Sequence, residues 1–349
     1  MKTKKVTLSD IAIKTGVSTA AVSMILNNKK ISRFSEETLK NVREVANELG
    51  YVSKSSLTPR KKLILIVCPS MINPYYTTLV QSMEIEAYRL GVSTISFNTY
   101  WDIEREKQVV SVANQNKVDG VIFAMVPQQN KVAHKINNII PFVVIGDKKM
   151  DLGVDTVDIN NFIAGRLMGE HYINFGHSEF AYISSPLSSD HSARTERLRG
   201  LTSICKEKGI KEPTLFIKDQ IIPEDELNYT ETEYNVGYDL ALKCLETYKS
   251  VTALVAMNDM IAYGVLDAVK SKGFSVPEDY SVSGFDNIFP SKLMGIELTT
   301  IDHHIIQRGK KATKILIAKL GYFGNPSEIT RVEYGSILIN RRTVSKPRE

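Results

Sequence analysis

The first part of the chain carries two short apolar stripes at helical spacing, with a glycine between them. Leu8, Ile11 and Thr15 fall on one face of a predicted first helix. Thr7 is a suitable N-cap for this helix, and Gly16 is a suitable terminator because glycine tolerates a left-handed backbone. The pattern therefore predicts a short helix followed by a tight turn.

A second short helix is predicted after the turn, with Ser18 as its N-cap. Val22, Ile25 and Leu26 form its inward stripe. The opposite face carries small, mostly uncharged side chains, namely Thr19, Ala20, Ser23, Met24 and Asn27. Such a helix suits insertion into the DNA major groove, whereas two capped helices alone are also typical of an ordinary surface hairpin.

A third helix, over residues 35–50, completes a minimal helix-turn-helix domain. Ser35 is its predicted N-cap, and Gly50 is its predicted terminator. The linker that follows, residues 52–62, is rich in serine, then basic, and contains Pro59, which breaks a helix. This linker is either a flexible tether or a segment that becomes ordered on DNA.

From residue 63 the pattern changes to short apolar runs that alternate with helix-period segments, which is typical of parallel sheets covered on both faces. The predicted strands are residues 63–68, 92–97, 119–124 and 142–146 in a first set, and 179–184, 214–218, 252–257 and 280–285 in a second. The predicted helices are 76–90, 103–116, 161–175, 194–208, 235–248, 259–272 and about 304–320, before a last strand at about 332–339 and a basic tail. Two such sets predict two α/β subdomains with a cleft between them, and ligands bind at the carboxyl ends of such strands.

Positive charge is concentrated at the start of the chain. The net charge is +5, yet residues 1–62 hold 13 Lys or Arg against 5 Asp or Glu, and the rest is slightly acidic. A basic head on an acidic body indicates a polyanionic partner for the head alone.

The cysteines and the hydropathy indicate the compartment. Cys68, Cys205 and Cys244 are far apart in apolar settings, which predicts free, buried thiols in a reducing compartment. No apolar run is long enough to span a membrane, and no apolar run follows the basic N-terminus as in a signal peptide. A cytoplasmic protein is expected.

The chemical motifs argue against an enzyme. No zinc-ligand pair, Gly-rich phosphate loop, dinucleotide fingerprint or G-x-S-x-G motif occurs. His303 and His304 are adjacent, so on a strand they face opposite ways and cannot chelate one metal ion. An Asp147–Asp286 pair is conceivable for glycoside hydrolysis but is the less favoured hypothesis. We expect no catalytic residues, no metal and no cofactor.

Residues along nearly the whole chain resemble the lactose-repressor (LacI/GalR) family of bacterial transcription regulators. Segments 7–27 and 35–51 are similar to the DNA-binding head of that family. The landmarks in the body are NPYY at 73–76, NT at 98–99, VDG at 118–120, GH at 176–177, RLRG at 197–200, ND at 258–259, GFD at 284–286 and LTT at 298–300. Each is weak alone, but their order and spacing together are specific.

The resemblance implies an all-α helix-turn-helix head on an α/β, periplasmic-binding-protein-like body of two parallel-sheet subdomains. It also implies a homodimer, a pseudo-palindromic double-stranded operator and a small sugar-like effector in the cleft. The expected boundaries are a head at 1–51, a hinge at 52–62, an effector-binding and dimerisation domain at 63–340 and a tail at 341–349. Within the body, the N-subdomain takes about 63–160 and 301–324, and the C-subdomain takes about 161–300 and 325–340.

The same resemblance implies the DNA contacts. Thr19 and Ala20 match positions nearest the base edges, and Ser23 matches one that reaches backbone or base. Met24 stands where the family commonly has arginine, so bidentate contact with guanine gives way to apolar contact with thymine methyls. The full expected set is Thr7, Ser18, Thr19, Ala20, Ser23, Met24 and Asn27 in the head, and Lys54, Leu57 and Arg60 in the hinge.

The hinge departs from the family pattern because it is several residues short. Leu57 is its apolar candidate for a wedge between base steps, and Pro59 limits any helix around it. We therefore expect the hinge to act mainly through basic side chains at phosphates, namely Lys54, Arg60, Lys61 and Lys62.

The expected effector contacts are polar side chains after strands, together with an aromatic face. Arg197 offers a planar fork of donors to hydroxyls or a carboxylate. The full set is Ser70, Asn73, Tyr75, Tyr76, Asp147, Arg197, Asn258 and Asp286. Each taken singly is as consistent with a loop cap or a surface ion pair, and the set converges only if the predicted fold is right.

The sequence thus predicts a DNA-binding transcriptional regulator, a repressor of carbohydrate-utilisation genes that a sugar or sugar-phosphate effector controls. Two alternatives stay open. One is a pleiotropic regulator that uses a phosphoprotein co-regulator, and the other is a cytoplasmic sugar-binding module with weak DNA specificity.

The operator is expected to differ from the usual family pattern at the base pair that faces Met24, because no arginine is present there to bind guanine. Selection of preferred sites from random DNA measures this for the wild type and for Met24→Ala. A guanine demanded by the wild type but not by Met24→Ala contradicts the prediction.

Overall fold

The computed structural model describes residues 6–26, 33–49, 51, 61–147, 153–187, 192–221, 230–320 and 328–348, without the side chains of Asn47, Asp147 and Ser192. The chain forms two compact units, Met1–Lys61 and Lys62–Glu349. We call them the head and the body, and we describe each by itself.

The head consists of α1 (Leu8–Thr15), α2 (Thr19–Leu26) and α3 (Glu36–Glu48), as the apolar stripes predict. The core that joins the helices is formed by Ile11, Val22, Ile25, Val42, Val45 and Ala46. Thr7 and Asp10 form a reciprocal capping box at the start of α1, and Gly16 ends it with φ +73°. Ser18 and Ser35 accept hydrogen bonds from the backbone N–H groups of Ala21 and Thr38, so both predicted N-caps are confirmed.

The first lobe of the body is built on a six-stranded parallel sheet, in the order β11-β5-β4-β3-β1-β2. Its strands are β1 (Leu63–Cys68), β2 (Ser93–Asn98), β3 (Gly120–Phe123), β4 (Phe142–Asp147), β5 (Asp155–Ile159) and β11 (Arg331–Tyr334). One face packs against α4 (Pro74–Arg89) and α12 (Ile305–Lys319), and the other packs against α5 (Ile103–Gln115) and α6 (Asn130–Asn137). The central strands β1, β3 and β4 are buried on both faces, which explains why their sequences are nearly continuous apolar runs.

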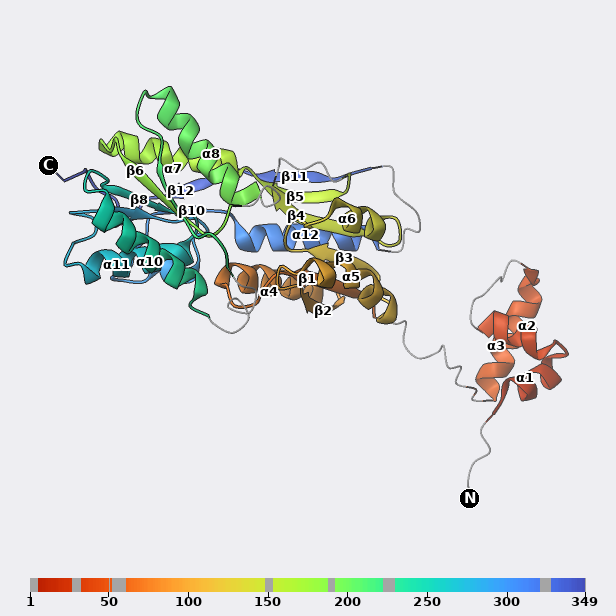
Figure 1. The fold of residues 1–349 in the computed structure, drawn as a ribbon. Coiled ribbons are helices and arrows are strands. Elements are labelled where there is room, and N and C mark those ends of the chain that lie inside the picture. Colours follow the sequence, from red (N-terminus) through yellow and green to blue (C-terminus); the bar gives the residue numbers. More distant parts are fainter. Residues whose placement is uncertain are drawn as a thin grey trace, which may run out of the picture. The chain divides into compact units, whose positions relative to one another are not determined.

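The second lobe is built on a four-stranded parallel sheet, in the order β7-β6-β8-β9. Its strands are β6 (Phe180–Ser184), β7 (Thr214–Ile217), β8 (Ala253–Ala256) and β9 (Ser281–Ser283). Figure 1 shows α7 (Asn161–Phe175) and α8 (Ser192–Glu207) on one side of this sheet and α10 (Thr232–Thr247) and α11 (Asp259–Ser271) on the other. The 3₁₀ helix η2 (Phe289–Lys292) precedes a small antiparallel pair, β10 (Thr300–Asp302) with β12 (Ile337–Ile339).

The end of the chain corrects two predictions. The strand predicted at 332–339 is two strands. Residues 331–334, which belong to the predicted C-subdomain segment 325–340, form β11 and pair with β5 in the sheet of the first lobe. The expected tail is also packed. Thr343 and Val344 are buried, and the N–H of Val282 donates to the carbonyl of Thr343 at 2.7 Å. Sequence analysis missed this packing because the residues around Thr343 and Val344 are basic, which is typical of an exposed tail.

Three further elements escaped prediction. The strand β5 has acidic residues within it, α6 is only eight residues long, and β10 is only three residues long. Each pattern is too short or too polar for periodicity to identify. The predicted free, buried state of Cys68, Cys205 and Cys244 is confirmed.

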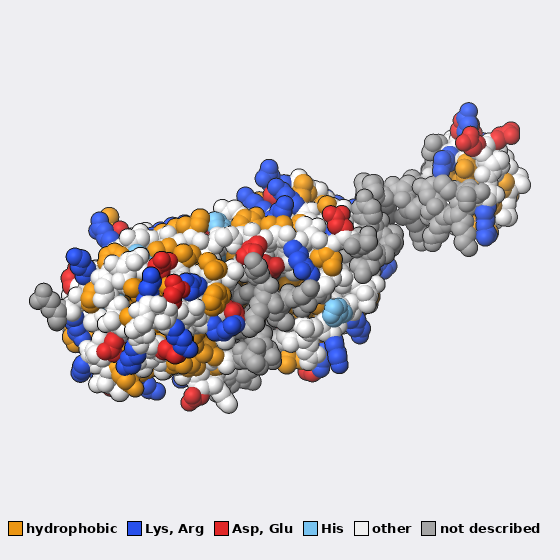
Figure 2. Space-filling model, turned by 90° about the horizontal axis from the view of Figure 1, so that it is seen from above, with side chains coloured by type: hydrophobic (Ala, Val, Ile, Leu, Met, Phe, Trp, Pro, Cys, Tyr) orange, Lys and Arg blue, Asp and Glu red, His pale blue; other side chains and the backbone are white. Residues whose placement is uncertain are grey.

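The surface of the body mixes charges of both signs with apolar side chains on the face that Figure 2 shows. Within the described ranges, none of the helices has the length and apolar character that crossing a membrane requires.

Paired glycines let the helices of the second lobe approach closely, and these helices carry the site residues. A Cβ on Gly165 of α7 would lie 2.0 Å from the carbonyl oxygen of Arg197 on α8. A Cβ on Gly237 of α10 would lie 2.1 Å from the carbonyl oxygen of Ile261 on α11. The close crossings therefore fix the position of α8 against α7 and of α11 against α10.

Replacing Gly165 with alanine is expected to lower the unfolding free energy of the body by about 1–3 kcal/mol, the usual cost of overpacking. The added methyl group would push α8 away from α7. Chemical denaturation followed by tryptophan fluorescence measures the change, because Trp101, the single tryptophan, lies in the body.

Gly335→Ala is the matched control, because a Cβ there has open space around it. Equal stability of Gly165→Ala and this control would show that the crossing is not tightly packed.

Candidate functional site

A cavity of about 430 Å³ lies between the two lobes of the body. Both lobes contribute residues that follow strands or begin helices, as the fold predicts. Seven of the eight predicted effector contacts line it, namely Ser70, Asn73, Tyr75, Tyr76, Arg197, Asn258 and Asp286. The eighth, Asp147, ends β4, but its side chain lies outside the described part of the structure.

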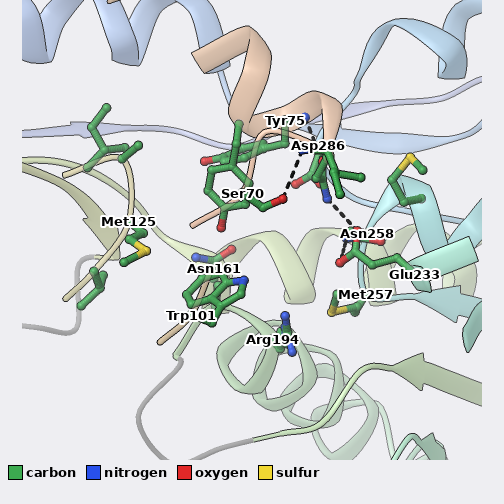
Figure 3. Close-up of a pocket in the computed structure, with 18 of the residues that line it drawn as sticks. Ser70, Tyr75, Trp101, Met125, Asn161, Arg194, Glu233, Met257, Asn258 and Asp286 are labelled. Carbon is green, nitrogen blue, oxygen red and sulfur yellow. Dashed lines mark hydrogen bonds between the residues drawn. The ribbon is translucent and has the colours of Figure 1, made fainter. Parts of the chain in front are cut away.

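Glu233 joins the two lobes across this cavity (Figure 3). One carboxylate oxygen accepts from Nδ2 of Asn73 at 2.6 Å, and the other accepts from Nδ2 of Asn258 at 2.9 Å. Asn73 caps α4 in the first lobe through its Oδ1, and Asn258 caps α11 in the second lobe in the same way. Each asparagine thus uses one end of its amide to start a helix and the other to hold Glu233.

Burial raises the pKa of Glu233, and the nearby Arg194 guanidinium opposes that shift. The residue as a whole is half-buried, but its carboxylate is shielded from water and relies on the two amide donors. A ligand hydroxyl that enters here would find an oriented acceptor, which is the type of group that fixes a polyhydroxylated ligand.

Arg197 is buried at the centre of a polar network in the second lobe. Its Nε donates to Oδ1 of Asn161 at 2.9 Å, and its Nη1 donates to the carbonyl of Met257 at 2.5 Å. Its Nη2 lies 3.5 Å from Oδ1 of Asp286 and 3.3 Å from Nδ1 of His303. Most of its donors are therefore already used, so Arg197 mainly orients Asp286 and the floor of the cavity.

His303 faces this network rather than a metal site. Burial and the two guanidinium groups of Arg197 and Arg308 hold the pKa of His303 well below its usual value, so its ring is neutral. Among the described residues, no cluster of three or more His, Cys, Asp or Glu side chains is placed to hold a metal ion.

Arg308 performs a similar role in the first lobe, and sequence analysis missed it. It is 2 % exposed, and its Nη1 donates to the hydroxyl of Tyr75 at 2.9 Å. Its Nη2 donates to the carbonyl of Gly146 at 3.2 Å. The buried guanidinium thereby fixes the ring of Tyr75 at the cavity wall.

Trp101 adds an aromatic wall that the sequence did not single out. Its ring lies 6.3 Å from that of Tyr76 in an edge-to-face contact. Tyr100 and Trp101 both have left-handed backbones, with φ of 56° and 58°, which is uncommon for bulky residues. The carbonyl of Trp101 accepts from Nε2 of Gln128, whose amide also donates to Glu106, so buried polar contacts hold the strained turn.

Asp259 is a fully buried carboxylate directly behind the cavity. Its oxygens accept from the N–H of Ile288 at 3.0 Å and from the hydroxyls of Ser291 and Thr300, both at 2.6 Å. Burial, and then the charge of Asp286, raise the pKa of Asp259. Burial also raises the pKa of Asp286, although Arg197 opposes it.

Four of the DNA-binding candidates of the head lie on α2, namely Thr19, Ala20, Ser23 and Met24. Thr19 and Ala20 are exposed, and Ser23 and Met24 are half-buried. The Thr7 and Ser18 hydroxyls are engaged as helix caps. The remaining candidates, Asn27, Lys54, Leu57 and Arg60, lie outside the described residues.

Asp259→Asn is expected to change how the stability of the body depends on pH. The folded-state pKa of Asp259 is raised, so its stabilising contribution is complete below the unfolded pKa of about 4 and is lost as the pH rises toward neutrality. The unfolding free energy of the wild type relative to Asp259→Asn should therefore fall over this range. Denaturation at several pH values, followed by Trp101 fluorescence, measures the difference.

Asp239→Asn, which makes the same substitution at an exposed position of α10, is the matched control. A constant difference between the wild type and Asp259→Asn would show that Asp259 titrates alike in the folded and unfolded chain.

Comparisons with known proteins follow this division into head and body. Residues 7–54 match bacterial regulatory proteins of the lacI family, and residues 61–341 match the periplasmic binding proteins and sugar binding domain of the LacI family. The chain is 31% identical over 315 residues to the HTH-type transcriptional regulator DegA of Bacillus subtilis, which covers 87% of this chain and 88% of that relative. It is 27% identical over 348 residues to the HTH-type transcriptional repressor PurR of Mannheimia succiniciproducens, across 97% of this chain and 99% of that one.

Solved structures show the same fold. A LacI family transcriptional regulator from Enterococcus faecium with bound ribose has a TM-score of 0.69 at 24% identity, over 82% of this chain and 99% of that chain. A CelR–cellobiose complex has a TM-score of 0.67 at 21% identity, over 97% of this chain and 100% of the other. The relatives named here are transcriptional regulators rather than enzymes. With both of its parts matched, the chain belongs to the LacI family of DNA-binding bacterial transcriptional regulators.

Proposed function

We propose that this protein is a cytoplasmic repressor of carbohydrate-utilisation genes, controlled by a small sugar-like effector in the cavity between the lobes. The protein acts as a homodimer, which places two α2 helices one DNA turn apart, about 34–36 Å, on a pseudo-palindromic operator. Effector binding favours one arrangement of the lobes and thereby changes how the heads engage DNA.

The single observation that supports this most is the cavity itself. It combines an oriented carboxylate, two helix-capping asparagines and aromatic walls, which is the combination that recognises hydroxyl groups and a sugar ring face. Solved relatives hold ribose or cellobiose, and a curated relative is named a repressor. The proposed contacts are Ser70, Asn73, Tyr75, Tyr76, Asp147, Asn258 and Asp286 from the sequence, with Trp101 and Glu233 added from the structure, while Arg197 positions Asp286.

The head supports the DNA-binding half of the proposal. The exposed side chains of Thr19 and Ala20 carry no charge, so α2 can approach base edges without an electrostatic penalty. The excess of Lys and Arg in residues 1–62 supplies phosphate contacts, which make affinity fall steeply as salt increases.

A substitution in the first turn of α2 tests whether the head alone binds DNA and the body alone binds sugar. Ala20→Asp should weaken binding to a selected operator by at least about tenfold, because it sets a negative charge against the bases, where one contact is worth about 1–3 kcal/mol. The same variant should bind sugars like the wild type, because residue 20 belongs to the head. Fluorescence anisotropy of labelled operator and Trp101 fluorescence measure the two activities separately.

Asn114→Asp introduces the same charge on an exposed position of α5 and should leave both activities unchanged. Equal operator binding by Ala20→Asp and the wild type would contradict the assignment of α2. A wild-type protein that binds all duplexes equally, and whose DNA binding ignores a ligand that changes Trp101 fluorescence, would contradict the proposed regulation.

A further inference from the structure

We propose that the effector carries an anionic group, a phosphate or a carboxylate, and that Arg194 binds it. The inference rests on the proposed function, because it takes the cavity between the lobes as the effector site. It narrows the ligand from any sugar-like molecule to an acidic one.

Arg194 is the cavity arginine that has donors to spare. It lies in the first turn of α8, is half-buried and lines the cavity. Its Nη1 donates to the carbonyl of Pro186 at 3.2 Å. Within the described ranges, no carboxylate lies close enough to form an ion pair with this guanidinium, which leaves most of its planar fork open to a ligand.

The other two cavity arginines bind protein groups through their terminal nitrogens, although the buried Nε of Arg308 has no hydrogen-bond partner among the described residues. Arg197 donates to Asn161 and Met257 and lies against Asp286, and Arg308 holds Tyr75 and Gly146. Both are buried, with exposures of 7 % and 2 %, whereas Arg194 keeps access to the cavity. An incoming anion therefore meets Arg194 first.

The described side chains that line the cavity carry more positive than negative charge. The described lining contains three arginines and two acids, Glu233 and Asp286. Asp286 faces Arg197, and both oxygens of Glu233 accept from amides. Arg194 acts electrostatically on the Glu233 carboxylate but forms no ion pair with a described residue, so its guanidinium can still take an anionic ligand in this partly desolvated site.

The position of Arg194 at the start of α8 also favours an anionic ligand. The first turn of α8 contains no acidic residue, although the positive end of the helix dipole favours negative charge there. A cationic side chain at this end is electrostatically unfavourable by itself. A bound anion removes that repulsion, because it interacts favourably with both the guanidinium and the dipole.

The aromatic wall indicates how the rest of the ligand lies. Figure 3 shows Trp101, Arg194, Glu233 and Asn258 around the same cavity. A sugar ring against Trp101 would direct hydroxyls to Glu233 and its acidic group to Arg194. A sugar phosphate and a sugar acid share this chemistry.

The test uses inorganic phosphate as the probe, with the full-length wild type, Arg194→Gln, Arg194→Lys and Arg199→Gln. Arg199 is an exposed arginine of the same helix and serves as the matched control. Thermal unfolding, followed by Trp101 fluorescence, is recorded with phosphate and with chloride at equal ionic strength. Comparison between variants removes the general stabilising effect of phosphate on folded proteins.

Phosphate is expected to stabilise the wild type and Arg199→Gln by more than it stabilises Arg194→Gln, with Arg194→Lys between them because it keeps the charge but loses the fork. The affinity for phosphate should fall by about 30-fold or more in Arg194→Gln, as when one partner of a buried charge pair is truncated. An equal shift in the wild type and Arg194→Gln, including no shift in either, overturns the proposal.

Glucose 6-phosphate, glucuronate and glucose then distinguish the source of the charge. Tighter binding of glucose 6-phosphate assigns a phosphate, and tighter binding of glucuronate assigns a carboxylate, in each case with loss in Arg194→Gln. If glucose binds as well as both acids, the charge assignment fails while the proposed function stands. If the acidic ligands bind through Arg194 but leave operator binding unchanged, the proposed regulation fails while the charge assignment stands.

Discussion

The Glu233 carboxylate forms a hydrogen-bonded bridge across the cavity, between the two lobes of the body. It accepts hydrogen bonds from an asparagine that begins a helix of the first lobe and from another that begins a helix of the second. Because the carboxylate is desolvated, losing either donor leaves a poorly satisfied charge. We infer that a ligand that contacts Glu233 would replace or reinforce these hydrogen bonds and thereby change the relative energy of the lobe arrangements.

The rest of the cavity follows from the way parallel α/β lobes are built. Strands end and helices begin at the same edge of each sheet, so the groups that cap helices also face the cleft. Asn258 caps α11 and holds Glu233, while the next residue, Asp259, ties η2 and β10 to the back of the site. Close helix crossings at Gly165 and Gly237 fix the positions of α8 and α11, which carry these side chains and Arg197. The side chains that start helices and tie loops together therefore also line or support the cavity.

Sequence analysis predicted the helices of the head, most strands of the body and seven residues of the cavity. These succeeded because apolar periodicity is strong in buried strands and because motifs such as NPYY and GFD lie at strand ends. Glu233, Arg194 and Arg308 were missed because each is an ordinary charged residue on a helix, and only tertiary packing turns it toward the cavity. Trp101 was missed because its exposure to the cavity depends on a left-handed turn that no local pattern predicts. The packing of Thr343 and Val344 was hidden by their basic neighbours.

The central claim is that the cavity and the DNA-binding head are thermodynamically coupled. Such coupling is reciprocal, so the factor by which a ligand changes operator affinity must equal the factor by which operator changes ligand affinity. The most direct measurement is the ligand dissociation constant, determined by calorimetry with and without saturating operator. A factor of about 100, for example, corresponds to a coupling of about 2.7 kcal/mol and must appear in both directions. Equal ligand affinity in the presence and absence of operator would contradict the coupling.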